Sequence, residues 1–421
     1  MMATTAEQAG IEVVELLRAN GFTGVHERFA AHLQALVSSG SLHDAWDSVQ
    51  QRHGRVTEVG EAVGEAGPSG TTVVRIPVHL ERGELMIELV VDETGRLAGL
   101  QLTPPAEPWQ APAYADETEF EEHDVTLGPH PFTVHGTLSA PRRSTGCPAV
   151  VLLAGGGPFD RDETVGSNKP LKDLAWGLAG RGIAVLRFDK VTHTHRDVAA
   201  HMDGFTMADE YVPHAVAAVG ALRAHPAVDS GRVFVLGHSM GGKVAPRVAA
   251  AEPAVAGLIL MAGDAEPMHR AAVRVTRYLA SLNPDNEAAA RSAIETLTRQ
   301  AESVDAPDLS PATPAGELPL GLSAAYWLDL RDYDPVATAV AVGKPMLILQ
   351  GGRDYQVTVD DDLARWRAGL EGRAGVTIRV YDADNHLFFP GTGPSTPAEY
   401  VPPQHVDPQV VTDIATWLTT T

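Results

Sequence analysis

The spacing of apolar residues changes along the N-terminal part of the chain. From Ile11 through Val14 and Leu17, and on to residue 49, apolar positions recur three or four residues apart, which predicts helices. Apolar and polar positions then alternate, as in antiparallel strands, over three segments joined by short glycine-containing turns: 72–80, 84–92 and 96–103. This order predicts a small, non-catalytic α+β domain over residues 1–103.

A different pattern begins after a proline-rich, acidic segment. Residues 104–118 show no periodicity and predict a linker. Over 119–421 strands and helices alternate. Continuous apolar segments are typical of strands buried on both faces of a parallel sheet, and they occur at 149–154, 183–188, 232–236, 257–261 and 346–350. The fold class is therefore predicted to be α/β, with a doubly wound, mainly parallel sheet.

The long interval between the last two of these strands contains helical patterns. They cover 269–282 and 287–303 and are followed by a proline-rich stretch. An insertion at this place predicts a helical cap at about 265–343, above the carboxyl edge of the sheet. Ligands bind at that edge in open α/β sheets.

A short motif joins one apolar strand to the helix that follows it. Residues 237–241 read GHSMG and come directly after the strand at 232–236. The pattern G-x-S-x-G in this context places a serine on a tight turn at a helix N-terminus, where side chains at the glycine positions would not fit. Ser239 is therefore the predicted nucleophile, and it requires a histidine base that is oriented by a carboxylate.

Two later loops supply these partners in the expected order. Asp354 follows the strand at 346–350, and His386 follows the strand at 376–381. Both positions lie at strand ends, as an acid and a base after the nucleophile require. The alternatives are a turn or helix-capping role for Asp354 and a structural role for His386.

The loop after the strand at 149–154 is a run of glycines, and its backbone can turn its N–H groups inward. We predict an oxyanion hole formed by the backbone N–H groups of Gly156 and Met240, with Gly157 as the alternative to Gly156.

Other polar residues receive structural interpretations. Residues 160–163, DRDE, predict an arginine–carboxylate network that braces the glycine loop, and Lys243 is predicted to be an exposed helix residue. His193, His195 and His201 lack further ligand spacing, so a metal site is not expected.

Several longer motifs together resemble a known family. The chain resembles bacterial α/β-hydrolases that are serine carboxylesterase-like, are related to dienelactone hydrolases and carry a small N-terminal domain of unknown function. The resemblance spans most of the chain and rests on the segments 111–116, 155–164, 168–190, 237–247, 347–357 and 385–391. It implies an α/β-hydrolase fold and acyl-ester hydrolysis through Ser239, Asp354 and His386.

The glycine loop departs from the family pattern. The family reads like His-Gly-Ser-Gly-Pro where this chain has Ala154, Gly155, Gly156, Gly157 and Pro158. The backbone donors remain, but two side chains beside them are lost. This difference predicts an altered pocket, as in an enzyme specialised for a biosynthetic substrate.

Composition and charge exclude other classes of function. Lys plus Arg is 32 and Asp plus Glu is 54, so the formal charge is −22, which opposes binding to nucleic acid or to anionic lipid. Cys147 is the single cysteine, so no intrachain disulfide can form. No secretory signal and no apolar run long enough for a membrane span is evident, which predicts a cytoplasmic protein.

These observations predict a serine hydrolase that cleaves an ester or thioester of a small-molecule acyl substrate without a metal or organic cofactor. The same triad could cleave amides or lactones or transfer acyl groups. A ligand-binding protein on a hydrolase scaffold is the non-enzymatic alternative, and a homodimer is left open.

Overall fold

A computed structural model of the chain describes residues 5–30, 33–34, 37–66, 71–103, 108–143, 145–198, 202, 204–282 and 287–421. The chain forms two compact units, residues 1–107 with 283–292 and residues 108–282 with 293–421. The boundary between residues 107 and 108 lies inside the predicted linker, of which residues 104–107 lie outside the described part.

The first unit is an antiparallel sheet with helices on one face. Its helices are α1 (Thr5–Arg18), α2 (Phe22–Glu27) and α4 (Ser39–His53). Its strands are β1 (Val56–Val59), β2 (Val63–Ala66), β3 (Thr72–Leu80), β4 (Gly83–Val91) and β5 (Leu97–Thr103), in the order β1-β3-β4-β5 with β2 paired to β3. Alternate residues of β3, among them Val74 and Ile76, are fully buried in the core to which Val13, Val14 and Leu17 of α1 belong. The predicted α+β arrangement is present.

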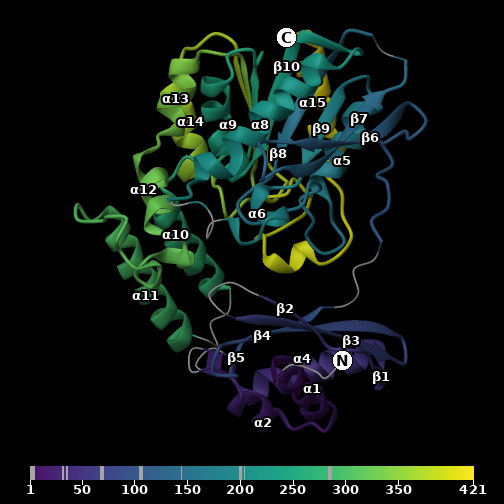
Figure 1. Cartoon of the computed structure of the whole chain (residues 1–421), viewed down its shortest axis with the longest axis vertical. Helices are drawn as coiled ribbons and strands as arrows, with labels where there is room; N and C mark the ends of the chain where they lie inside the picture. Colours follow the sequence, from purple (N-terminus) through teal and green to yellow (C-terminus); the bar gives the residue numbers. More distant parts are fainter. Residues whose placement is uncertain are drawn as a thin grey trace. The chain divides into compact units, whose positions relative to one another are not determined.

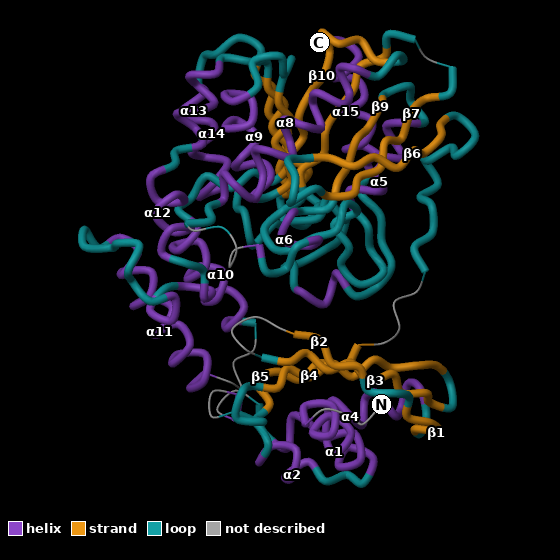
Figure 2. Tube along the Cα trace, in the orientation of Figure 1, coloured by secondary structure: helices purple, strands orange, loops and turns teal. Residues whose placement is uncertain are grey.

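The second unit contains an eight-stranded sheet, drawn as orange strands in Figure 2. Its order is β13-β12-β11-β10-β8-β9-β7-β6. Among these described strands only β7 runs in the opposite direction, antiparallel to its neighbours β6 and β9. The strands are β6 (Phe120–Leu127), β7 (Val134–Pro141), β8 (Cys147–Leu153), β9 (Ala184–Phe188), β10 (Val228–His238), β11 (Leu258–Met261), β12 (Met346–Gly351) and β13 (Val376–Tyr381).

Helices cover both faces of this sheet, as Figure 1 shows. On one face, α5 (Pro170–Ala179) and α15 (Pro408–Thr420) pack with the even-numbered residues of β8, such as Val150. On the other face, α8 (Met207–Ala224), α9 (Met240–Ala251), α13 (Pro335–Val342) and α14 (Ala364–Leu370) pack with its odd-numbered residues. The central strands are therefore buried on both sides, which explains their continuous apolar sequence.

The edge strand β6 was harder to delimit from sequence. The spacing predicts a strand over 125–127, whereas β6 begins at Phe120. Residues 121–124 of β6 are exposed and polar, so they lack the apolar signal that marks the inner strands.

The interval between β11 and β12 is helical, as predicted. It contains α10 (Met268–Ser281), α11 (Glu287–Asp305), the short turns η3 (Ala315–Glu317) and η4 (Pro319–Gly321), and α12 (Ala324–Asp332). Two further short helices, α6 (Val191–Thr194) and η6 (Pro397–Tyr400), lie in loops, and η5 (Val359–Leu363) leads directly into α14. Within the described residues, every helix is too short or too polar to cross a bilayer.

Candidate active site

The turn between β10 and α9 has the geometry of a nucleophile elbow. Ser239 adopts φ 52° and ψ −121°, a strained conformation for a residue with a side chain. A Cβ atom at Gly237 would lie 2.0 Å from the Gly241 carbonyl oxygen, and one at Gly241 would lie 2.4 Å from the Leu153 carbonyl oxygen. The turn therefore tolerates only glycine at both positions, as the sequence predicted.

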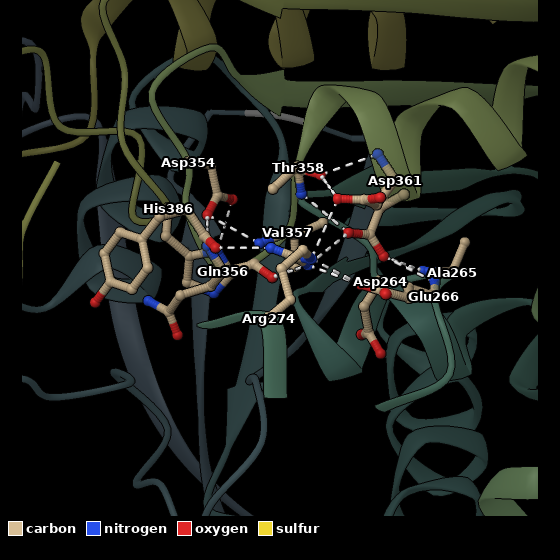
Figure 3. A network of polar contacts seen from close by, with 12 residues as sticks. Asp264, Ala265, Glu266, Arg274, Asp354, Gln356, Val357, Thr358, Asp361 and His386 are labelled. Atoms are coloured by element: carbon tan, nitrogen blue, oxygen red, sulfur yellow. Dashed lines mark hydrogen bonds and ion pairs between the residues drawn. The ribbon is translucent and has the colours of Figure 1, made fainter. Parts of the chain in front are cut away.

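Asp354 and His386 meet across the ends of β12 and β13. The Nδ1 atom of His386 lies 2.7 Å from Oδ2 of Asp354, and both side chains are buried. The other oxygen, Oδ1, accepts the backbone N–H groups of Gln356 at 2.8 Å and Val357 at 3.0 Å. Figure 3 shows these contacts. The carboxylate is thus fixed in the orientation that directs His386.

The elbow lies against the histidine loop through the residue before the serine. The Nε2 atom of His238 is 2.9 Å from the carbonyl oxygen of His386, and the centroids of the two imidazole rings are 4.7 Å apart. Because β10, β11, β12 and β13 are parallel neighbours, Ser239, Asp354 and His386 all lie at the carboxyl edge of the sheet. The structure brings the three predicted residues to one region.

The glycine loop after β8 lies beside the elbow. A Cβ atom at Gly155 would lie 3.3 Å from Cβ of Ser239, and one at Gly156 would lie 3.3 Å from Cε of Met240. The N–H group of Gly155 donates to Oε1 of Glu163 at 2.8 Å, so it is already engaged within the protein. The two predicted oxyanion donors, Gly156 and Met240, belong to adjacent segments.

A buried lysine binds the backbone of the same loop. Lys190, at the end of β9, donates from Nζ to the carbonyl oxygen of Gly155 at 3.0 Å and to the Tyr211 hydroxyl at 2.7 Å, and it forms an ion pair with Glu210 at 3.0 Å. Burial lowers the pKa of Lys190, and Glu210 opposes this shift. A role for Lys190 was not predicted from the sequence, although its place two residues after an apolar strand was a signal for the carboxyl edge.

The network predicted for residues 160–163 is present. Arg161 binds both oxygens of Asp189, at 2.9 and 2.8 Å, and Asp162 accepts from Arg187 at 2.8 Å. Glu163 departs from this pattern, since it contacts Gly155 and His238 instead of an arginine.

The prediction for Lys243 is wrong. Its side chain is buried, and Nζ lies 2.9 Å from Asp264, which follows β11. A helix position one turn beyond the elbow is covered by that neighbouring loop, which the helical periodicity does not reveal.

Among the described residues, no group of His, Cys, Asp and Glu side chains is arranged to hold a metal ion. His193 and His195 contact backbone carbonyl oxygens of Pro158 and Thr133, and His201 lies outside the described residues.

The helix α10 holds the turn that carries Asp354. Arg274 donates to the carbonyl oxygens of Tyr355 at 2.9 Å and Gln356 at 3.0 Å, and it forms an ion pair with Glu266 at 2.9 Å (Figure 3). A cavity of about 460 Å³ lies at this turn and is lined by Arg274, Tyr278 and Asp354 among others. The predicted cap is therefore tied to the acid turn by the hydrogen bonds from Arg274 to its backbone.

One buried carboxyl near His386 has no partner. Neither oxygen of Asp384 has a hydrogen bond within the described part of the chain, and the side chain is fully buried. Burial raises the pKa of Asp384 to about 7, with a smaller contribution from Asp407. This carboxyl titrates near neutral pH, two residues before His386.

Comparisons with known proteins identify related sequences. Residues 167–389 match the hydrolase family model described as serine aminopeptidase, S33. Over 416 residues the chain is 33% identical to esterase EstD of Thermotoga maritima, and the match covers 98% of this chain and 95% of that protein.

Solved structures with weaker similarity include an esterase of Pyrococcus furiosus and a dienelactone hydrolase of Anabaena variabilis. The first has a TM-score of 0.45 at 16% identity and covers 76% of this chain and 97% of its own. The second has a TM-score of 0.42 at 17% identity and covers 72% and 98%. The family match, the relative at 33% identity and the sheet order agree, and the chain belongs to the α/β-hydrolase family, as a member of its esterase type.

Proposed function

We propose that the chain hydrolyses a carboxylic ester or thioester through an acyl-enzyme formed on Ser239. The observation that carries the proposal is the buried hydrogen bond between His386 and Asp354 beside a strained serine turn. An oriented imidazole of this kind can accept the serine proton, which a serine hydroxyl requires before it attacks a carbonyl.

The reaction then proceeds in two halves. Ser239 Oγ attacks the carbonyl carbon while His386 takes its proton, and the backbone N–H groups of Gly156 and Met240 bind the developing oxyanion. His386 returns the proton to the leaving alcohol or thiol, and the acyl group remains on Ser239. Water, deprotonated by His386, releases the acid and restores the serine. Asp354 stays ionised and stabilises the imidazolium form of His386.

Intact-mass labelling with a fluorophosphonate tests the nucleophile. The wild-type protein is expected to gain one adduct, and Ser239→Ala none. Ester turnover in Ser239→Ala should fall by about three to six powers of ten, with the circular dichroism spectrum unchanged. Full ester turnover by Ser239→Ala would refute the mechanism.

Amide cleavage is the second candidate, since the matching family model is described as a serine aminopeptidase. Esters, thioesters and amides of one acyl group, assayed side by side, separate the two activities. A higher kcat/KM for the amide would replace the ester proposal, and transfer to an added amine would indicate an acyltransferase.

The glycine loop supports a narrower proposal about specificity. Ala154 and Gly156 lie in the segment before Pro158, at places where the family pattern that the chain resembles has polar side chains, and we propose that this difference suits a specialised biosynthetic substrate. Generic short esters should then be poor substrates in comparison with their hydrolysis by esterase EstD. Equal efficiency on these esters would contradict this proposal and leave the serine mechanism intact.

A further inference from the structure

Two buried ionisable residues touch the proposed catalytic groups but take no part in the mechanism described above. His238 lies between Gly237 and Ser239 in the elbow and is 4% exposed. Glu163 follows the glycine loop and is 2% exposed. Each is the other's partner, since Nδ1 of His238 lies 2.9 Å from Oε1 of Glu163.

Both ring nitrogens of His238 face acceptors. Nε2 lies 2.9 Å from the carbonyl oxygen of His386, and a carbonyl can only accept, so Nε2 carries a proton. Nδ1 faces a carboxyl oxygen that also accepts the N–H group of Gly155 at 2.8 Å. A proton shared between a carboxyl and an imidazole belongs on the imidazole, because the ordinary pKa of histidine is about two units higher. Both nitrogens therefore carry protons.

We propose that His238 is a protonated imidazolium at neutral pH, paired with ionised Glu163, and that this pair positions the catalytic loops and holds a positive charge beside His386. The inference rests on the proposed function of His386 as the base. Neither residue acts on the substrate, and both are positioning residues.

The positioning role follows from the connections of the pair. Oε1 of Glu163 binds the glycine loop at Gly155 as well as His238 of the elbow. His238 in turn binds the backbone of His386. One ion pair thus joins the three segments that supply the nucleophile, the base and the oxyanion donors.

The pair also places a charge beside His386. The His238 ring faces Glu163 at Nδ1 and the His386 ring, whose centroid is 4.7 Å away. Asp354 is bound to the far ring, at Nδ1 of His386. Lys190 contacts the carbonyl oxygen of Gly155. Burial lowers the pKa of His238, and the charge and hydrogen bond of Glu163 outweigh this effect and raise it. Since Glu163 binds the nitrogen that does not face His386, the charge nearer to His386 is positive.

The chain provides a matched control in His214. Its Nε2 atom lies 2.7 Å from the Phe132 carbonyl oxygen, and its buried Nδ1 has no hydrogen-bond partner within the described residues. Burial lowers the pKa of His214. His214 is therefore expected to be neutral in the same protein in which His238 is charged.

Nitrogen-15 NMR of the full chain, labelled at histidine, tests the protonation directly. Signals are assigned by their loss in His238→Gln and His214→Gln. At pH 7.5 both nitrogens of His238 should be protonated, whereas His214 should show one bare nitrogen. In Glu163→Gln, the His238 ring should become neutral, which assigns the signal even if His238→Gln does not fold. A bare nitrogen on His238 in the wild type overturns the inference.

The pH profile of kcat/KM tests the positioning role. In Glu163→Gln, the acid limb, which is the fall of kcat/KM at low pH, should move to higher pH by about half a unit to one unit. In the same variant kcat should fall more than KM rises. Glu163→Asp should restore part of both, and His214→Gln should leave the acid limb in place. An equal loss at every pH, with the limb unmoved, would show that Glu163 acts only in folding. The NMR result does not depend on turnover, so failure of the proposed hydrolysis and failure of this inference are distinguishable.

Discussion

The two units of the chain differ in what they bury. In the described part of the first unit, the buried side chains are apolar, with Trp46, Ile76 and Ile87 among the largest. The second unit buries charged groups as well, among them Glu163, Arg187, Lys190, Lys243 and Asp354. Ionised groups are costly to bury unless they are paired. These charged groups concentrate at the carboxyl edge of one sheet, where the proposed chemistry takes place, whereas the described core of the first unit contains none.

Breaking a buried pair of the second unit should produce the largest effect on stability. Lys190→Met leaves Glu210 without its cation in a buried site. We expect a loss of about 3–5 kcal/mol in the free energy of unfolding, measured by urea denaturation. The matched change in the first unit is Arg75→Met, whose partners Glu65 and Glu88 are partly exposed, and it should cost less than about 1 kcal/mol. Equal losses in the two variants would contradict the comparison.

The buried carboxyl of Asp384 tests the same comparison through the pH dependence of the free energy of unfolding. The pKa of Asp384 is raised to about 7 in the folded protein, so the folded state binds more protons than the unfolded state between about pH 4 and pH 7. Stability should therefore fall as the pH rises through this range and level off above it.

Asp384→Asn removes that dependence. The variant should exceed the wild type by roughly 2–4 kcal/mol at pH 8 and by almost nothing near pH 4, as measured by thermal unfolding at both pH values. The same advantage at pH 4 would show that packing, not ionisation, is the cause.

The smallest expected effect lies in the apolar core of the first unit. Ile76→Val removes one methylene group from a fully buried position of β3 and should cost about 1 kcal/mol, without pH dependence. Once corrected for the folded fraction, kcat should equal that of the wild type. A change in the acid limb of the pH profile would show that the first unit influences the catalytic groups.

Much of the fold could be predicted from sequence because its signals are local. Continuous apolar strands, helical spacing and the glycines of the elbow each act within a few residues. Ser239, Asp354 and His386 could be placed at one edge of the sheet because each follows a recognisable strand in a known order.

The missed features depend on contacts between distant loops. Lys190 reaches the Gly155 carbonyl oxygen, and His238 reaches Glu163, across intervals of 35 and 75 residues. Spacing along one element cannot show such contacts. The error on Lys243 has the same origin, since its cover comes from the loop at Asp264.

The contact of Lys190 and Tyr211 with the Gly155 carbonyl oxygen has a consequence for electrostatic preorganisation. That oxygen and the N–H group of Gly156 belong to one planar, trans peptide group, so they point in opposite directions. A peptide plane anchored at its oxygen cannot flip without breaking both contacts. The direction of the Gly156 N–H dipole is therefore fixed in advance, and the proposed oxyanion donor needs no reorientation energy when negative charge develops.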